Sequence, residues 1–66
     1  MATLKYDQEA DALAITFGCG PSEGEEVHRN VILHFDAADR IVEIEILHAS
    51  KVLAAGAVDG LPGEQP

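Results

Sequence analysis

Large apolar residues alternate with polar or small ones in two stretches near the N-terminus. Leu4 and Tyr6 belong to the first stretch, and the second is ALAITF, residues 12–17. A period of two is typical of a β-strand with one buried face. An antiparallel hairpin that pairs Tyr6 with Leu13, and Leu4 with Ile15, puts the large residues of both stretches on one face.

The connection between these strands is acidic. The segment YDQEADAL, residues 6–13, holds three acids within eight positions. Asp7 is expected to accept hydrogen bonds from the backbone N–H groups that follow it, so we predict a short helical turn over residues 7–12 that sets the hairpin register. The alternative is a cation site of Asp7, Glu9 and Asp11, but the segment lacks the Gly and the distal Glu of a calcium loop.

The clearest alternation covers residues 31–36 (VILHFD) and 41–47 (IVEIEIL). One hairpin register places their large apolar residues on a common face, with Val31 opposite Ile46, Leu33 opposite Ile44 and Phe35 opposite Val42. The same register gathers four polar side chains on the other face, namely His34, Asp36, Glu43 and Glu45. We predict a β-hairpin here.

The remaining segments are shorter. Three glycines and a proline predict a loop over residues 18–24 (GCGPSEG), and a short strand is expected over residues 25–29. Ser50 is expected to cap a helix over residues 51–55, which Gly56 ends.

The predicted fold is therefore mainly β. It is a small antiparallel meander of four to five strands built from two hairpins, with one short C-terminal helix. Residues 1–55 are predicted to form a single domain. Residues 56–66 are rich in Gly and Pro and poor in large apolar residues, so a disordered tail is predicted there.

Charge and length narrow the functional classes. The 66 residues include 12 acids and 4 Lys or Arg, for a formal net charge of -8. Such a surface repels phosphate backbones and anionic lipids, so we expect neither nucleic-acid nor membrane binding. No apolar run reaches the roughly 20 residues that span a bilayer, and no signal-peptide pattern is present, so a cytoplasmic protein is expected. Cys19 is the single cysteine, which excludes an internal disulfide and leaves oligomerisation, or as the weaker alternative a metal, as the support for so short a chain.

The polar side chains of the second hairpin are the best candidate for chemistry. His34 lies opposite Glu43 in the predicted register, and a histidine beside a carboxylate can be an oriented base or half of a metal site. A solvated sheet face has the same composition. We therefore mark His34, Asp36, Glu43 and Glu45 as a candidate ligand-binding set. We assign no catalytic residue, no metal and no cofactor, because the sequence places no third nitrogen or sulfur ligand.

Other reactive side chains carry weaker signals. The spacing of His28, His34 and His48 matches no zinc pattern. Cys19 is followed by acids, which raise the pKa of a thiol instead of activating it. An incidental loop cysteine is therefore expected.

Two longer segments carry a family resemblance. The combination of YDQEADALAITF (residues 6–17) with NVILHFDAADRIVEIEILHASK (residues 30–51) resembles the small bacterial proteins grouped as domain of unknown function 2283. Members of that group read like Y-D-x-E-A-D-A-L-Y-I and then G-V-I-L-D-Y-D-x-x-G-x-I-V-G-I-E-I-L-x-A-S-K. The resemblance covers about residues 4–53 and implies a small antiparallel β-sheet protein with a short C-terminal helix. It implies no reaction.

The chain departs from the pattern of that group at four positions. His34 and His48 stand where acidic or other polar residues are frequent, and Glu43 stands where a small residue is frequent. Asn30 replaces a frequent glycine and tolerates the same left-handed backbone. If the group shares a polar site, its chemistry does not transfer directly to this chain.

The apolar face of the sheet predicts self-association. One short helix is too small to cover it, and an open face of that width exceeds the apolar patches of soluble monomers. We expect a homodimer with an interface of Leu4, Tyr6, Leu13, Ile15, Phe17, Val31, Leu33, Phe35, Val42, Ile44 and Ile46. The expected function is a self-associating structural or protein-interaction module without catalytic activity, with an unidentified protein as a further partner. The alternative is a small ligand-binding protein or hydrolase that uses the polar face.

Overall fold

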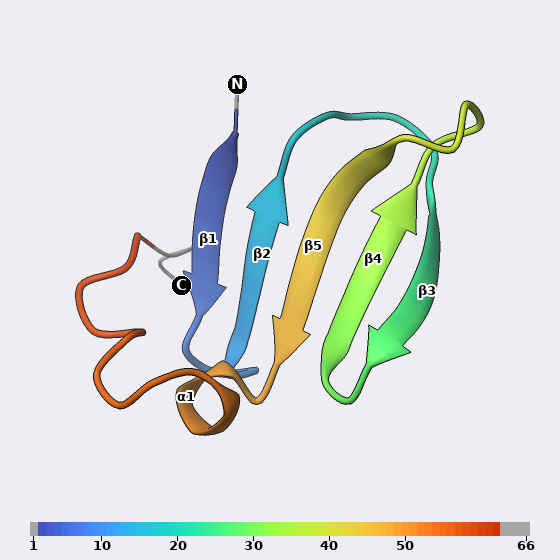
Figure 1. Ribbon diagram of the computed structural model, residues 1–66. Helices are drawn as coiled ribbons and strands as arrows, with labels where there is room; N and C mark the ends of the chain where they lie inside the picture. The colour runs from blue at the N-terminus through green and yellow to red at the C-terminus, as the bar shows by residue number, and fades with distance from the viewer. Residues whose placement is uncertain (1, 63–66) are drawn as a thin grey trace.

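The alternating segments form one five-stranded antiparallel sheet in the computed structural model, which describes residues 2–62. The elements are β1 (Thr3–Asp7), β2 (Ala12–Thr16), β3 (Glu23–His28), β4 (Val31–Phe35), β5 (Ile41–Leu47) and α1 (Ala49–Val52). The mainly β class with one short C-terminal helix is confirmed. The strand order is β1-β2-β5-β4-β3 (Figure 1), which differs from a pure meander in one place. After β2 the chain passes over one end of the sheet to its far edge and then returns strand by strand.

The first hairpin has the predicted register. Tyr6 lies opposite Leu13 and Leu4 opposite Ile15. In the connecting turn the Asp7 carboxylate accepts hydrogen bonds from the backbone N–H groups of Glu9 at 3.0 Å and Ala10 at 3.2 Å. The predicted capping role of Asp7 is thus confirmed.

The second hairpin follows the predicted register over most of its length. Val31 pairs with Ile46, Leu33 with Ile44 and His34 with Glu43. Phe35, however, lies opposite Ile41, so the predicted pair of Phe35 with Val42 is wrong.

A tight turn explains this shift. The Asp36 N–H donates to the Arg40 carbonyl at 2.9 Å, which leaves three residues in the loop, and Asp39 adopts the left-handed conformation at φ 64°. Such three-residue hairpin loops combine a type I turn with a left-handed residue. The turn and the body of the hairpin therefore differ by one residue in register, and a bulge on β5 absorbs the difference.

β3 forms the edge of the sheet beside β4 and is exposed along its whole length. It begins at Glu23, so the last two residues of the predicted loop belong to this strand. It ends at His28, one residue before the predicted end. Glu25 lies opposite Leu33 and Gly24 opposite His34, which places Glu25 on the apolar face and Gly24 on the polar face.

The helix differs from its prediction in position and in its cap. It spans Ala49–Val52 and not residues 51–55, and its N-cap is His48 in a left-handed conformation with no side-chain cap. Ser50 therefore is not the cap. Its hydroxyl instead donates to the Asp11 carboxylate at 2.7 Å. Within the described residues no helix is long and apolar enough to cross a membrane.

The tail covers one side of the apolar face. The buried residues are Tyr6, Leu13 and Ala49, and residues of the tail pack against them, namely Leu53, Val58 and Leu61. Figure 1 shows the tail beside β1, where the Tyr6 N–H donates to the Pro62 carbonyl at 2.8 Å. Residues 54–60 consist largely of turns. Residues 63–66, the end of the predicted disordered tail, lie outside the described residues, and the prediction of disorder stays a prediction.

Candidate functional site

Three of the four predicted polar residues meet on the polar face of the sheet. His34 of β4 lies opposite Glu43 of β5, and Glu45 follows two residues later on the same face. The His34 Nε2 atom lies 3.0 Å from Glu45 Oε1 and 3.5 Å from Glu43 Oε1. The side chains are 21%, 31% and 34% exposed for His34, Glu43 and Glu45, so the cluster is partly sheltered and still open to solvent. We call these three residues the polar cluster.

Neighbouring strands hold the polar cluster in place. Thr16 of β2 pairs with Glu43, and its hydroxyl donates to Glu43 Oε2 at 3.1 Å. On the other side Gly24 of β3 leaves room for the imidazole, because a Cβ there would lie 2.9 Å from His34 Cε1. Four strands thus contribute to one arrangement, and the glycine of an edge strand is part of it.

Asp36, the fourth predicted residue, has a different role. Its Oδ1 accepts hydrogen bonds from the backbone N–H groups of Ala38 and Arg40, both at 2.9 Å, and its Oδ2 accepts one from Arg40 Nε at 3.0 Å. The hydrogen bond from the Arg40 backbone, more than any other contact, lowers the pKa of Asp36 from its usual value. Asp36 shapes the β4–β5 turn, and the structure does not bring it into the polar cluster.

A second polar centre joins the first hairpin to α1. The Asp11 carboxylate accepts the Tyr6 hydroxyl at 2.6 Å, the Ser50 backbone N–H at 2.9 Å and the Ser50 hydroxyl at 2.7 Å. The Asp11 carbonyl also accepts the Ala49 N–H at 2.8 Å, and Asp11 itself is left-handed at φ 53°. We call Tyr6, Asp11 and Ser50 the aspartate latch, because it fastens α1 to the first hairpin.

The aspartate latch changes the acidity of its members. The Tyr6 hydrogen bond, followed by those from Ser50, lowers the pKa of Asp11, since all of them favour the carboxylate. The bond to Asp11, together with burial and nearby carboxylates, raises the pKa of Tyr6. Sequence reasoning placed Asp11 in the turn of the first hairpin but missed this contact, because Asp11 and Ser50 are 39 positions apart.

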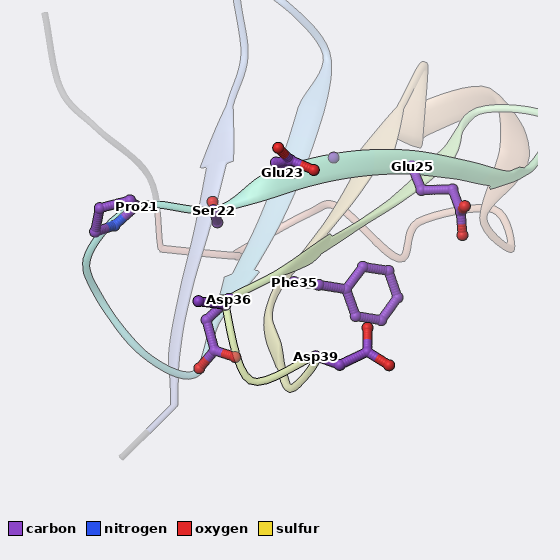
Figure 2. A pocket seen from close by; sticks show the side chains of 9 residues that line it. Pro21, Ser22, Glu23, Glu25, Phe35, Asp36 and Asp39 are labelled. Atoms are coloured by element: carbon purple, nitrogen blue, oxygen red, sulfur yellow. The ribbon is translucent and has the colours of Figure 1, made fainter.

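An open hollow of about 860 Å³ lies beside β3 (Figure 2). Its lining comprises Pro21, Ser22, Glu23, Gly24, Glu25, Phe35, Asp36, Ala37 and Asp39. Figure 2 shows the Phe35 ring between the β3 ribbon and the turn that carries Asp39. Four carboxylates around one aromatic ring disfavour an anionic ligand. The hollow offers no nitrogen or sulfur side chain for catalysis.

The comparisons with known proteins place the chain in a family. The model of the family described as "Protein of unknown function (DUF2283)" matches residues 3–50, which is most of the 66 residues. The chain belongs to the DUF2283 family. No curated protein and no solved structure was found to match it.

The segment matched to DUF2283 contains all five strands, the polar cluster and the aspartate latch. The tail that covers Tyr6 and Leu13 follows it. The family assignment confirms the resemblance found from the sequence, and it assigns no activity to the polar cluster.

The remaining candidates in this DUF2283 chain lie apart from the polar cluster. His28 ends β3, with Nδ1 3.4 Å from the Arg29 carbonyl oxygen, and His48 is the left-handed residue before α1. Cys19 is exposed in the β2–β3 loop. Among the described residues, the one group of three or more His, Cys, Asp or Glu side chains with metal-binding proximity is the polar cluster itself.

Proposed function

We propose that this DUF2283 protein is a structural or interaction module without catalytic activity, and that it works as a homodimer through its apolar sheet face. The observation that carries the proposal is an excess of surface. The chain exposes 4887 Å². A monomeric globular protein of this size exposes about 4,000 Å². The chain thus exposes more surface than a typical monomer of its size, as a chain with an uncovered face would, and a standard interface buries ~800 Å² of each partner.

The part of the apolar face that the described residues do not cover lies on β4 and β5. The buried side chains of the described chain, Tyr6, Leu13 and Ala49, all lie where α1 and the tail cover the sheet. On β4 and β5 the apolar side chains are only partly buried, and Leu33 and Ile44 lie side by side there. The predicted interface therefore divides into two parts. The chain's own tail packs against the cluster of Tyr6 and Leu13, and the β4–β5 part around Leu33 and Ile44 is where we propose that a second copy binds.

Burial and charge act in opposite directions on such a dimer. Burying about 600 Å² of apolar area per chain is worth on the order of 15 kcal/mol before the entropy of association is subtracted. Two chains with a net charge of -8 each repel one another at long range. Added salt screens that repulsion, so the homodimer should tighten as ionic strength rises.

Two neighbouring residues on opposite faces of β4 provide the test. Leu33 faces Ile44 on the apolar side, and Ile32 lies between Glu26 and Glu45 on the polar side. Light scattering at micromolar concentration should give twice the chain mass for the wild type and for Ile32→Lys. Leu33→Lys carries the same charge change and should give a monomer or an unfolded chain.

Two outcomes would overturn the proposal. One is a folded wild-type monomer at every concentration, and the other is equal behaviour of both lysine variants. Co-purification from the native host would then show whether a different protein covers the same face.

The second candidate function is ligand binding or hydrolysis on the polar face. The contact of His34 with two carboxylates favours it, because an oriented imidazole can bind a cation or move a proton. The proposed homodimer leaves this face free, so the two functions are compatible.

A further inference from the structure

Two of the three ligand pairs in the polar cluster have the spacing of ligands around one ion. Metal-bound nitrogen and oxygen atoms lie about 2.0–2.2 Å from Zn²⁺, so two ligands of one ion are separated by about 2.8–3.6 Å in octahedral to tetrahedral geometry. The His34 Nε2 atom lies 3.0 Å and 3.5 Å from the two glutamate oxygens. One atom from each of the three residues lies within 4.8 Å of the others. The 4.8 Å limit exceeds that range, so the two glutamate side chains would turn toward a common ion to complete the site.

The sequence alone led us to expect no metal site, because it places no third nitrogen or sulfur ligand. The structure instead brings an oxygen of Glu45, which was expected on the same face, to His34 through a diagonal contact across the β4–β5 ladder. Diagonal neighbours are within reach of long side chains, and their contact depends on rotamers that the register does not determine.

The surroundings support the three ligands. The Thr16 hydroxyl occupies Glu43 Oε2 and leaves Oε1 beside His34. Gly24 lets the imidazole lie against the β3 backbone. Contacts of this kind fix the orientation of ligands in metal sites. All five of these residues lie on strands, and strands hold a site more rigidly than loops do.

The local charge also favours a cation. In the described chain the one ion pair formed by a Lys or Arg joins Arg40 to Asp36, away from the polar cluster. Glu43 and Glu45 therefore share only the His34 imidazole as a partner of opposite charge, and a neutral imidazole leaves two carboxylates uncompensated. A divalent ion would neutralise both.

We infer that His34, Glu43 and Glu45 form a binding site for one divalent transition-metal ion of the Zn²⁺ class, with Thr16 and Gly24 as positioning residues. One imidazole nitrogen with two carboxylate oxygens suits Zn²⁺ better than Mg²⁺ or Ca²⁺, which prefer oxygen ligands alone. The exposed side of the site leaves coordination positions for water or for a small ligand. This inference goes beyond the proposed homodimer and does not depend on it, because the polar cluster lies on the opposite face.

Calorimetric titration of the untagged full-length chain with Zn²⁺ tests the site. The Cys19→Ser background is used because an exposed thiol binds Zn²⁺ by itself. We expect one ion per chain, with affinity for Mg²⁺ at least 100-fold weaker. His34→Ala and Glu43→Gln should each weaken Zn²⁺ binding at least tenfold, and Thr16→Val should weaken it about tenfold through lost orientation of Glu43.

Two matched variants separate this site from general attraction to an acidic surface. His28→Ala removes a histidine from β3, and Glu25→Gln makes the same charge change as Glu43→Gln on the opposite face. Both should bind Zn²⁺ as the wild type does. Backbone amide NMR shifts on adding Zn²⁺ should centre on residues 34, 43 and 45, which keeps the test decisive if one variant fails to fold. Weak heat from several sites, unchanged in Glu43→Gln, would overturn the inference, and so would NMR shifts centred elsewhere.

Discussion

Tyr6 and Leu13, on the β1–β2 side of the sheet, are 9% and 6% exposed, whereas all six residues of β3 at the other side are exposed. The β1–β2 side has α1, the tail and the aspartate latch over its apolar face. The β4–β3 side has no such cover within the described residues. The same alternation of apolar residues therefore yields a packed core on one side and a half-open surface on the other. A sheet face becomes a core only where another segment lies over it.

The two edges of the sheet are also protected differently. On β1 the Tyr6 N–H is satisfied by the Pro62 carbonyl, so the tail covers part of this edge. On β3 the protection is charge and irregularity, with three glutamates and a register shift between Glu26 and His28. Charged side chains and bulges are common means of preventing edge-to-edge pairing. We therefore place the proposed contact between copies on the apolar face and not on the β3 edge.

The strongest test of this comparison makes the same substitution on both sides. Leu13→Ala should lower the free energy of unfolding by about 2–5 kcal/mol, because it leaves a cavity beneath Ala49 and the tail. In so small a domain that loss leaves a large fraction of the molecules unfolded. Leu33→Ala should cost less within one chain and should mainly weaken the homodimer. Thermal melts over a hundredfold range of protein concentration distinguish the two.

Concentration dependence decides the outcome of this pair. The deficit of Leu33→Ala relative to the wild type should grow as protein concentration rises, because association stabilises the wild type more than it stabilises a variant with a weaker homodimer. The deficit of Leu13→Ala should not depend on concentration. If both leucines gave the same loss at all concentrations, the two sides would be equally packed within the monomer. The comparison would then fail.

Strand registers were predictable from the sequence because a shift by one residue would move every large apolar side chain to the wrong face. That constraint correctly placed Tyr6 opposite Leu13, and it brought His34 opposite Glu43. It failed at Phe35, where the hydrogen bonds of the Asp36 turn outweigh the apolar pairing. Local turn chemistry sets the pairing next to a turn, and the apolar pattern sets it elsewhere.

The start of α1 and the geometry of the polar cluster depend on contacts between distant residues, which no short sequence pattern contains. Ser50 has the residue type of a helix cap, but its hydroxyl is held by Asp11, and the helix starts earlier, at Ala49. The Glu45 contact with His34 depends on side-chain rotamers, and the position of Gly24 depends on where β3 pairs with β4. The polar cluster was therefore predictable as a set on one face, but its geometry was not.

The aspartate latch should make the covered side sensitive to pH. Folding lowers the pKa of Asp11, so its contribution to stability is fully present above the ordinary carboxyl pKa of about 4 and is lost as pH falls through the lowered value. Folding raises the pKa of Tyr6, so its contribution is present below about pH 10 and is lost as pH rises through the raised value. The latch should therefore be fully effective at neutral pH.

We expect Asp11→Asn to lower the melting temperature strongly at pH 7 and much less at pH 3, where the wild-type carboxyl is largely protonated in the unfolded chain. Asp39→Asn is the matched control, because Asp39 is also a left-handed turn residue, at φ 64°, and asparagine tolerates that conformation. The melting temperature of Asp39→Asn should equal that of the wild type at pH 7 and at pH 3. An equal loss for Asp11→Asn at pH 7 and pH 3 would mean that the ionised carboxylate does not hold the latch.

The smallest expected effect concerns Asp7, whose carboxylate caps the β1–β2 turn without reaching α1. Asp7→Ala removes the acceptor for the Glu9 and Ala10 N–H groups and should cost about 1 kcal/mol, as the loss of a capping residue usually does. Glu9→Ala removes an acid from the same exposed turn while keeping the backbone N–H that Asp7 binds, so it should change the free energy of unfolding by much less. Chemical denaturation of both variants measures the difference. Equal losses would show that the net charge of the turn matters and the cap does not. A loss from Asp7→Ala alone would show that the covered side relies on a local cap as well as on the aspartate latch.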